Sequence, residues 1–378
     1  MRIDLVITEL FVGGAERCLT ELAIGLQESG DNVRVFSLGA LPPPDQGQGN
    51  HRLLVERLEK AGIPIASANA NSKRQSFAAY RQLKQWFQAS RPDICQTFLF
   101  HANVLGTQAA KSAEVPLCVG GIRIAESKWL RCQIERRAVS QMHSVVCVSN
   151  AVKEFTDEYL GCEPEKSLVI PNAVDVTRFG TANPFNWTTL GWPAQSKVSL
   201  FVGRLHPQKG IELLQQQIDT IAPANSDRKL LLVGDGPLRG DLENWADRIG
   251  KNRVLLLPWQ TDVAPLMRAC RILILPSHYE GMPNVVLEAM AAARPVVCSK
   301  VEGSSELLSH SPDKQGFPRG DSLAMKNLVE QFLSNEVLCN QIGDDNQARV
   351  RNDFSIAAMV DSYRSHYRTL LTRRVDSE

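Results

Sequence analysis

The stretch Arg271-Ile-Leu-Ile-Leu-Pro-Ser-His-Tyr-Glu-Gly-Met-Pro-Asn-Val-Val-Leu-Glu-Ala-Met290 places an apolar strand directly before a turn and a helix. Its run of Ile and Leu predicts a buried strand of a parallel sheet. Pro283 suits the first helical position, where its missing N–H costs nothing, and the free amides of a helix start favour a phosphate. Glu280 in the turn and Glu288 in the helix would repel that phosphate unless they face uncharged groups such as sugar hydroxyls. The stretch therefore predicts a site for a sugar joined to phosphate.

Strands and helices alternate along the rest of the chain. The predicted strands lie near residues 3–8, 32–38, 94–98, 115–121 and 144–149, and again near 198–203, 229–233, 253–257, 271–275 and 295–298. Alternation of this kind is typical of parallel sheets covered by helices on both faces. In the helix predicted over residues 14–29, Leu19, Leu22 and Leu26 form one apolar stripe that would pack on the sheet. We therefore expect α/β domains of the doubly wound, Rossmann-like kind, which bind ligands at the carboxyl ends of their strands.

The length of 378 residues is ample for two domains of ordinary size. Residues 180–196 contain turn-forming residues without periodicity, as a linker does. We therefore expect one Rossmann-like domain over residues 1–180 and a second over residues 197–354. The tail after residue 322 is helical in pattern, and residues 355–378 are expected to form a separate C-terminal helix.

The composition excludes several classes of protein. A net charge of +1, from 42 Lys and Arg against 41 Asp and Glu, argues against a nucleic-acid partner. The nine cysteines form no C-x-x-C pair and are expected to be buried free thiols in a reducing compartment. Charges interrupt the apolar runs well before the roughly 20 residues that a membrane span needs. We expect a cytoplasmic protein that is at most peripheral to a membrane.

Four motifs follow one another in the order of a known family. They are Gly13-Gly-Ala-Glu16 after the first strand, Ile170-Pro-Asn-Ala-Val-Asp175 at mid-chain, Val202-Gly-Arg-Leu-His-Pro-Gln-Lys-Gly210, and the E-x7-E pair Glu280 and Glu288. With them the chain resembles the retaining glycosyltransferases of family 4, which have the GT-B fold, from about residue 5 to residue 300. The resemblance implies two Rossmann-like domains facing a cleft, with the C-terminal helix packed back on the first domain. It also implies transfer of a hexose from a nucleotide-diphosphate sugar to a hydroxyl acceptor.

Two cations, Arg204 and Lys209, lie where the first strand of the second domain meets its helix, between Gly203 and Gly210. Fixed cations there would stabilise the negative charge that grows on a departing diphosphate. A solvated basic turn is the alternative. The sequence has no acidic D-x-D motif, so we expect neither a metal nor a cofactor, with the nucleotide sugar, such as a UDP-hexose, as a substrate.

The resemblance assigns the two glutamates to the donor. Glu280 is expected to contact hexose hydroxyls, and Glu288 is expected to accept hydrogen bonds from both ribose hydroxyls. Helix capping is the alternative for the pair. Gly13 and Gly14 allow close approach of the backbone to a ligand, although a simple helix-starting turn would explain them too. The full set of expected donor-binding residues is Gly13, Gly14, Gly203, Gly234, Gly236, Gly281, Met282, Pro283, Asn284 and Glu288.

In the first domain, His101 follows a strand end and opens a helix. A lone histidine is usually structural, but members of the family often carry one here, facing the reacting sugar. His101 therefore joins Arg204, Lys209 and Glu280 as the expected catalytic residues. Glu16, Arg123 and Asn172 are expected to bind the acceptor. An ordinary surface ion pair of Arg123 with Glu126 is an alternative, and Ala173 replaces a glycine common in the family.

Two further possibilities stay open. Lys73, Arg74, Arg81 and Lys84 alternate with aromatic residues that could touch anionic lipid, although this spacing is equally typical of a core-facing helix. The acceptor is expected to be a glycan or a lipid-linked saccharide of cell-surface polysaccharide synthesis. The rival functions are a nucleotide-sugar epimerase of the same architecture and a non-catalytic sugar-nucleotide-binding protein. An NAD-dependent oxidoreductase is disfavoured because no G-x-G-x-x-G follows the first strand.

Overall fold

A computed structural model describes residues 1–43 and 51–375. The chain divides into two compact units: unit 1 comprises Met1–Asn172 with Ile356–Glu378, and unit 2 comprises Ala173–Ser355. Residues 173–196, expected to end the first domain and to link it to the second, group with unit 2, where Trp187 and Trp192 are buried and Trp192 donates to the Lys251 carbonyl (2.8 Å). Each unit is described by itself.

Unit 1 contains a seven-stranded sheet with the order β3-β2-β1-β4-β5-β6-β7, in which all neighbours are parallel. Its order reverses between β1 and β4, so the carboxyl ends of these two strands form the crevice where such sheets bind ligands. The strands are β1 (Arg2–Ile7), β2 (Asn32–Ser37), β3 (Ile65–Ser67), β4 (Ile94–Phe98), β5 (Leu117–Ile122), β6 (Ser144–Cys147) and β7 (Ser167–Val169).

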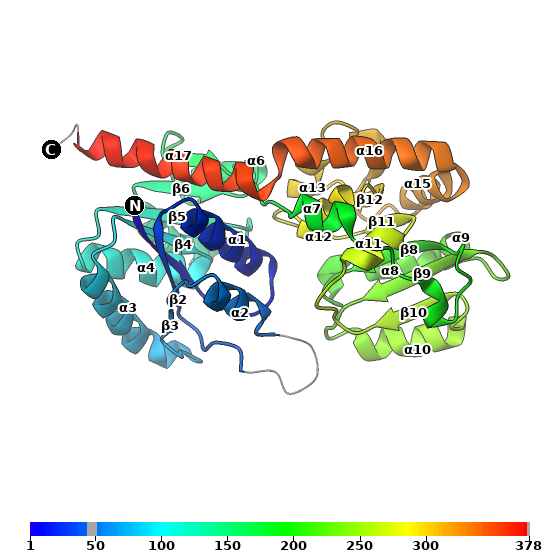
Figure 1. Ribbon diagram of the computed structural model, residues 1–378, viewed down its shortest axis with the longest axis horizontal. Coiled ribbons are helices and arrows are strands. Elements are labelled where there is room, and N and C mark those ends of the chain that lie inside the picture. Colours follow the sequence, from blue (N-terminus) through cyan, green and yellow to red (C-terminus); the bar gives the residue numbers. More distant parts are fainter. Residues whose placement is uncertain (44–50, 376–378) are drawn as a thin grey trace. The chain divides into compact units, whose positions relative to one another are not determined.

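The helices of unit 1 form two groups. One comprises α1 (Gly14–Glu28) and α2 (Leu53–Lys60), with α17 (Ile356–Val375) packed on α1. The other comprises α3 (Ser76–Ser90), α4 (Phe100–Ser112) and α5 (Trp129–Val139), which lie side by side, and α6 (Asn150–Tyr159) follows β6 (Figure 1). Right-handed crossovers that run toward β3 place α1 and α2 on one face of the sheet, and crossovers that run toward β7 place α3, α4 and α5 on the other face.

The predicted stripe of α1 is confirmed, because Leu19, Leu22 and Leu26 are fully buried. The return of the C-terminal helix to the first domain is confirmed as well. A Cβ on Gly25 of α1 would lie only 2.4 Å from Val360 of α17, so glycine permits the close packing of the two helices.

Unit 2 contains a six-stranded parallel sheet with the order β10-β9-β8-β11-β12-β13, which reverses between β8 and β11. The strands are β8 (Lys197–Val202), β9 (Arg228–Val233), β10 (Val254–Leu257), β11 (Ile272–Leu275), β12 (Val296–Ser299) and β13 (Gly316–Phe317). The helices are α7 (Val176–Thr181), α8 (Ile211–Gln216), α9 (Ile218–Ile221), α10 (Arg239–Ile249), α11 (Ala264–Ala269), α12 (Asn284–Ala291), α13 (Glu302–Leu307), α14 (Pro312–Gln315), α15 (Ser322–Ser334) and α16 (Glu336–Asp353). The expected pair of Rossmann-like sheets is therefore present; the short strands β3, β7 and β13 were not foreseen.

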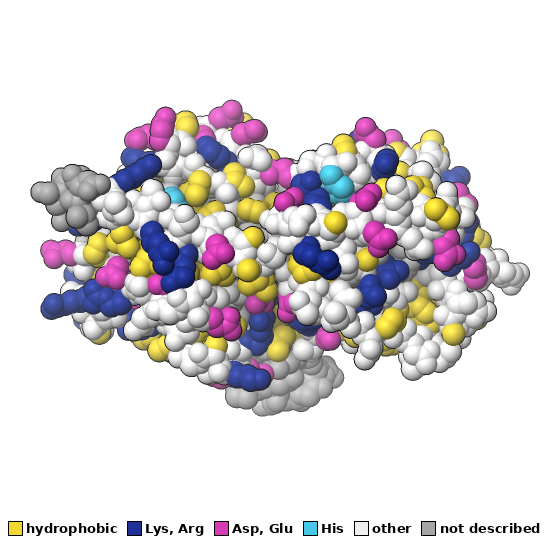
Figure 2. Space-filling model, turned by 45° about the horizontal axis from the view of Figure 1, so that its top comes forward, with side chains coloured by type: hydrophobic (Ala, Val, Ile, Leu, Met, Phe, Trp, Pro, Cys, Tyr) yellow, Lys and Arg dark blue, Asp and Glu magenta, His cyan; other side chains and the backbone are white. Residues whose placement is uncertain are grey.

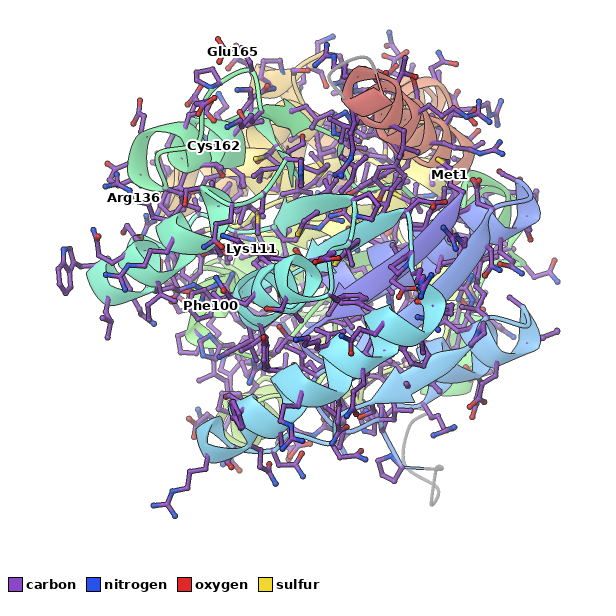
Figure 3. All side chains as sticks on the ribbon, turned by 90° about the vertical axis from the view of Figure 1, so that its left-hand side faces the viewer. Met1, Phe100, Lys111, Arg136, Cys162 and Glu165 are labelled. Carbon is purple, nitrogen blue, oxygen red and sulfur yellow. The ribbon has the colours of Figure 1, made fainter. Side chains whose placement is uncertain are left out.

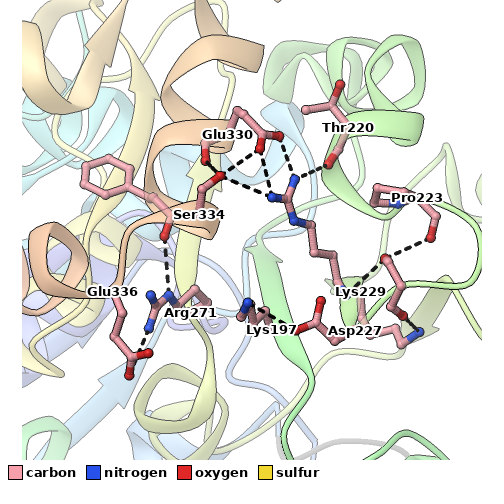
Figure 4. Close-up of polar contacts among 12 residues, drawn as sticks. Lys197, Thr220, Pro223, Asp227, Lys229, Arg271, Glu330, Ser334 and Glu336 are labelled. Atoms are coloured by element: carbon pink, nitrogen blue, oxygen red, sulfur yellow. Dashed lines mark hydrogen bonds and ion pairs between the residues drawn. The ribbon is translucent and has the colours of Figure 1, made fainter.

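Polar contacts fasten α15 to the sheet of unit 2 (Figure 4). Arg228, at the start of β9, donates to both carboxylate oxygens of Glu330, at 2.6 and 2.9 Å. These bonds, with help from Ser334, lower the pKa of Glu330 to about 2. Because the Glu330 side chain is half exposed, water screens the pair and its net stabilisation is small.

The nine cysteines are all buried and unbridged, as the sequence predicted. In the described residues, no helix is both long and apolar enough to span a lipid bilayer. The surface seen in Figure 2 intersperses Lys and Arg with Asp and Glu.

Two glycines in helices of unit 2 should respond oppositely to alanine. A Cβ on Gly343, within α16, would lie 2.3 Å from the carbonyl oxygen of Ala293, whereas a Cβ on Gly240, near the start of α10, would meet nothing within 4 Å. We expect Gly343→Ala to lower the free energy of unfolding by about 1–3 kcal/mol through overpacking. Gly240→Ala should raise it by up to about 1 kcal/mol, because alanine loses less backbone entropy.

Denaturant unfolding of both variants and the parent measures the difference. Equal effects of the two substitutions would contradict the packing of α16 described here.

Candidate active site

The loop after β8 carries the predicted cations and packs directly on the loop after β11. Gly210 has a φ of +62°, and a Cβ there would lie 2.1 Å from the Pro276 carbonyl oxygen. Two hydrogen bonds join the same loops: the His278 amide donates to the Gln208 carbonyl (2.8 Å), and the Gln208 side chain donates to the Tyr279 carbonyl (2.9 Å). Only glycine fits at position 210, so this residue sets the distance between the two loops.

This packing brings Lys209 and Glu280 together. The Lys209 Nζ lies 2.5 Å from Glu280 Oε1, and the Ser277 hydroxyl donates to the same oxygen at 2.7 Å. Both side chains are largely buried, which strengthens their attraction relative to an exposed pair. Arg204 belongs to the same loop but is exposed. Two of the four predicted catalytic residues are therefore in direct contact.

The start of α13 holds the Glu280 turn from the other side. The Glu280 amide donates to Glu302 Oε2 at 3.1 Å, and a Cβ on Gly303 would lie 1.9 Å from the Gly281 carbonyl oxygen. Sequence reasoning missed Ser277 and Glu302. Glu302 could have been found, because it follows the strand after the E-x7-E helix and parallel strands end at one edge of the sheet.

Glu288 lies in the second turn of α12 and is buried. Pro283 immediately precedes α12 as its N-cap, with φ −77° and ψ 109°, so the expected first helical position is off by one residue. Met282 is also buried, and Asn284 begins the helix. The predicted donor segment thus forms one continuous turn and helix after β11.

Gly234 and Gly236 have a structural explanation. Their φ values are +147° and +156°, and a Cβ would lie 1.9 Å from the Gly203 carbonyl oxygen and 2.4 Å from that of Leu205, respectively. The loop after β9 therefore packs backbone to backbone on the loop after β8. Contact of these glycines with a nucleotide stays a prediction.

In unit 1, the glycine turn after β1 carries a buried carboxylate. Gly13 is the N-cap of α1, and a Cβ on it would lie 2.2 Å from Glu16 Oε2, so the Glu16 side chain folds back over the start of the helix. The pKa of Glu16 is raised to about 7, mainly by burial and in part by the charge of Glu9, while a backbone hydrogen bond and the charge of Arg123 act in the opposite direction. Near neutral pH, Glu16 is therefore a mixture of the acid and the carboxylate, unlike an exposed glutamate.

Arg123 follows β5 and points into the same region. It donates to the Cys18 sulfur, and its guanidinium lies 5.1 Å from the centre of the Phe98 ring. Its Nε and Nη1 have no hydrogen-bond acceptor among the described residues. The alternative of an ion pair with Glu126 is wrong, because Glu126 pairs instead with Lys128 (2.7 Å) and Arg131.

His101 is the second residue of α4 and is exposed, with its ring 5.1 Å from that of Phe100. Leu99, just before α4, has a φ of +74°, which costs a non-glycine residue about 1–3 kcal/mol and often marks a functional site. Nothing in the sequence around Leu99 indicates this strain. Asn172 is buried at the end of the first segment of unit 1.

The predicted residues are thus divided between the units. Unit 1 contains His101, Gly13, Gly14, Glu16, Arg123 and Asn172, and unit 2 contains the other predicted site residues. Within residues 1–43 and 51–375, no three His, Cys, Asp or Glu side chains gather as a group that could hold a metal ion.

Two family descriptions match the chain. Residues 12–178 match Glycosyltransferase Family 4, and residues 196–335 match Glycosyl transferases group 1. The chain is also 30% identical to the UDP-Gal:alpha-D-GlcNAc-diphosphoundecaprenol alpha-1,3-galactosyltransferase of Escherichia coli over 307 residues, 76% of this chain and 77% of the relative. The chain therefore belongs to the family 4, group 1 glycosyltransferases, a retaining family with the GT-B fold, and is an enzyme of that class.

Other similarities extend over nearly the whole chain. The phosphatidyl-myo-inositol mannosyltransferase of Mycobacterium leprae is 27% identical over 374 residues, 95% of this chain and 94% of the relative. The crystal structure of HepE from Anabaena in complex with UDP has a TM-score of 0.83, with 22% identity over 98% of this chain and 100% of that one. At that identity the structure supports the fold alone.

The pKa of Glu16 gives a test of its burial. The unfolded chain releases this proton near its ordinary pKa of 4.5, whereas the folded chain keeps it until about pH 7. The folded state therefore binds more protons in this window, and its stability falls as the pH rises through it. We expect Glu16→Gln to remove this fall, which amounts to at most about 3 kcal/mol.

Unfolding free energies of the parent and variant between pH 4 and pH 8 measure the effect, with Glu28→Gln, exposed on the same helix, as the control. Parallel curves for Glu16→Gln and the parent would show that Glu16 is solvated.

Proposed function

We propose that this enzyme moves a hexose from a nucleotide-diphosphate sugar to a hydroxyl of a glycan or lipid-linked saccharide, with retention of anomeric configuration. The observation that carries the proposal is the buried Lys209–Glu280 pair beside the reversal between β8 and β11. The pair places a cation that could bind a diphosphate next to a carboxylate that could accept a hydrogen bond from a sugar hydroxyl. The names of relatives support it: the Escherichia coli relative is a galactosyltransferase with a UDP-Gal donor, and HepE has been crystallised with UDP-glucose.

In the proposed donor complex, Lys209 and Arg204 bind the diphosphate, Glu280 the hexose and Glu288 the ribose. Glu280 neutralises Lys209, at 2.5 Å. A diphosphate would take over that cation and free one carboxylate oxygen for the hexose. Ser277 and the Glu280 amide bond to Glu302 keep the carboxylate in place during this exchange. The site is thus pre-organised for charge that develops on the leaving group.

Retention follows if the acceptor approaches on the same side as the departing phosphate. The two glutamates belong to the donor unit and are assigned to hydroxyls, which leaves neither as the base that inversion would need. The leaving phosphate can then take the acceptor proton while Lys209 stabilises it. His101 would donate a hydrogen bond to the sugar, and Glu16, Arg123 and Asn172 would line the acceptor side.

Cell-surface polysaccharide synthesis is the setting we propose. The Escherichia coli relative acts, by its name, on a diphosphoundecaprenol-linked sugar, and another relative, from Staphylococcus aureus, is named for capsular polysaccharide biosynthesis. Nine buried, unbridged cysteines support a reducing compartment, and we propose the cytoplasm, at the inner face of the membrane.

Turnover is expected to survive EDTA, because the proposed mechanism uses no metal ion. Loss of turnover on chelation, with rescue by Mn²⁺, would contradict a metal-independent mechanism.

The decisive experiment combines a donor panel with product analysis. Thermal shifts with UDP, GDP and ADP sugars identify the nucleotide, since ligand at about 100 times its Kd adds about 2.7 kcal/mol of stability. Turnover with an acceptor should then release the nucleoside diphosphate, and proton NMR should show an α-glycoside from an α-linked donor. A β product would refute retention. An altered hexose formed without acceptor would indicate the epimerase, and binding without turnover a non-catalytic protein.

Lys209→Ala should affect turnover more than donor binding, because the charge that Lys209 meets grows as the sugar–phosphate bond breaks. We expect kcat to fall by roughly 10², the size found for one electrostatic stabiliser, with a smaller loss of donor affinity. The exposed Lys251→Ala in the same unit is the matched control. Steady-state kinetics and calorimetric titration of the donor measure the two effects, and equal losses would contradict the assignment.

A further inference from the structure

Positive charge is concentrated in one part of unit 1. Residues 71–141, which include α3, α4 and α5, contain eleven Lys and Arg against four Asp and Glu, a net charge of +7, whereas the whole chain has +1. These three helices lie side by side. A nearly neutral protein thus has one group of neighbouring helices suited to an anionic partner.

Helix α5 turns large apolar side chains to solvent. Trp129 is 74% exposed, Leu130 64% and Ile134 38%, while its inward side consists of Cys132, Glu135, Ala138 and Val139. Phe77, at the start of α3, is 70% exposed. Positions 129, 130 and 134 share one side of a helix. An apolar outer side of this kind is typical of a surface that contacts something other than water.

Cations flank these apolar residues. Lys128, Arg136 and Arg137 are exposed at the two ends of α5, and Figure 3 labels Arg136 on this helix. The nearby acids balance these cations only in part, since Lys128 pairs with Glu126 at 2.7 Å. Glu135 is buried and accepts a hydrogen bond from Asn103 at 2.9 Å, and Glu126 is shared by Lys128 and Arg131. The outer side of α5 is therefore apolar at its start and basic at its end.

The location connects this surface to the proposed acceptor side. Helices α3, α4 and α5 follow parallel strands, so all three start at the carboxyl edge of the sheet, where open α/β sheets bind ligands. The Arg131 guanidinium lies 4.6 Å from the centre of the Phe100 ring, so α5 touches α4 next to His101. Phe77, Trp129 and Leu130 thus lie at the same edge as His101.

We propose that α5 and the start of α3 dock on the surface of an anionic lipid bilayer. Phe77, Trp129, Leu130 and Ile134 would enter the headgroup region, where aromatic side chains are favoured, and Lys128, Arg136 and Arg137 would contact anionic headgroups. The sequence had raised lipid contact for α3 alone, yet Leu83 and Phe87 of that helix are buried. Docking of this kind would bring the enzyme to a lipid-linked acceptor, and only this link to the acceptor rests on the proposed function.

Vesicle binding tests the inference without catalysis. The full chain should co-sediment with phosphatidylcholine vesicles that contain phosphatidylglycerol, and much less with phosphatidylcholine alone. Binding should weaken as salt is raised from about 0.1 M to about 1 M, because the screening length shrinks from about 10 Å to about 3 Å. Brominated lipid should quench the tryptophan fluorescence of the parent, and less that of Trp129→Phe.

Two variants separate the apolar and electrostatic contributions. Trp129→Ser with Leu130→Ser should lower the partition coefficient at least about tenfold. Arg136→Glu with Arg137→Glu should lower it at least about 25-fold, since each cation near an anionic surface contributes about fivefold. The matched controls in unit 2 are Leu323→Ser with Val337→Ser and Arg248→Glu with Lys251→Glu, all at exposed positions, which should bind as the parent does.

Several results would overturn the inference: no vesicle binding by the parent at low salt, unchanged binding by both α5 variants, or equal losses in the controls. If the parent self-associates but does not bind vesicles, and the α5 variants no longer self-associate, the surface is an interface with a second copy of the chain instead. If the proposed function also holds, both α5 variants keep transfer to a detergent-solubilised acceptor and lose transfer to one embedded in vesicles. A parent that binds vesicles but transfers no sugar would refute the function and leave the docking surface standing.

Discussion

The close backbone contact between the loops after β8 and β11 is the constraint on which the rest of the proposed donor site depends. Gly210 lies against the Pro276 carbonyl, and no larger residue would fit. Glycine allows two more close backbone contacts at the same edge of the sheet, since Gly234 lies against Gly203 and Gly303 against Gly281. Four loops are thereby packed without intervening side chains. This packing brings the start of the Lys209 side chain close to the Glu280 turn, and the two side chains form an ion pair.

Unit 1 uses a different principle, the burial of charge. Glu16 folds over the start of α1, and the half-buried Arg123 has two buried guanidinium nitrogens and lies near Cys18, Phe98 and Tyr363. Tyr363 belongs to α17, which Arg364 ties to Asp31 and Tyr367 to Gln96, at 2.7 and 3.0 Å. The end of the chain therefore completes the surroundings of residues near the first turn. Buried charges with few partners are costly, and groups with strongly perturbed pKa values cluster at functional sites.

The two units divide the proposed work according to these principles. A rigid, glycine-packed edge suits a diphosphate, which needs cations at fixed positions. In unit 1, Glu16 titrates near neutral pH and two nitrogens of Arg123 have no hydrogen-bond acceptor among the described residues. Groups of this kind suit an acceptor hydroxyl, which must give up hydrogen bonds to water and form new ones with the enzyme. The basic, apolar outer side of α5 adds a physical route by which an acceptor held in a bilayer would reach that unit.

The sequence by itself determined the two parallel sheets, the buried strands, the glycine turns and the identity of the chemical groups, because strand and helix periodicity and Gly or Pro turns are local properties. Lys209 and Glu280, 71 positions apart, could be predicted through motif order but not as an ion pair. Only the tertiary structure decided that contact, the support from Ser277 and Glu302, the pKa of Glu16, and the partners of Glu126. It also decided which apolar residues face water. Phe87 and Trp129 are both aromatic residues in predicted helices, yet Phe87 is buried and Trp129 is exposed. The physical reason is that burial and pairing depend on which elements pack together, and that is settled between segments far apart in the chain.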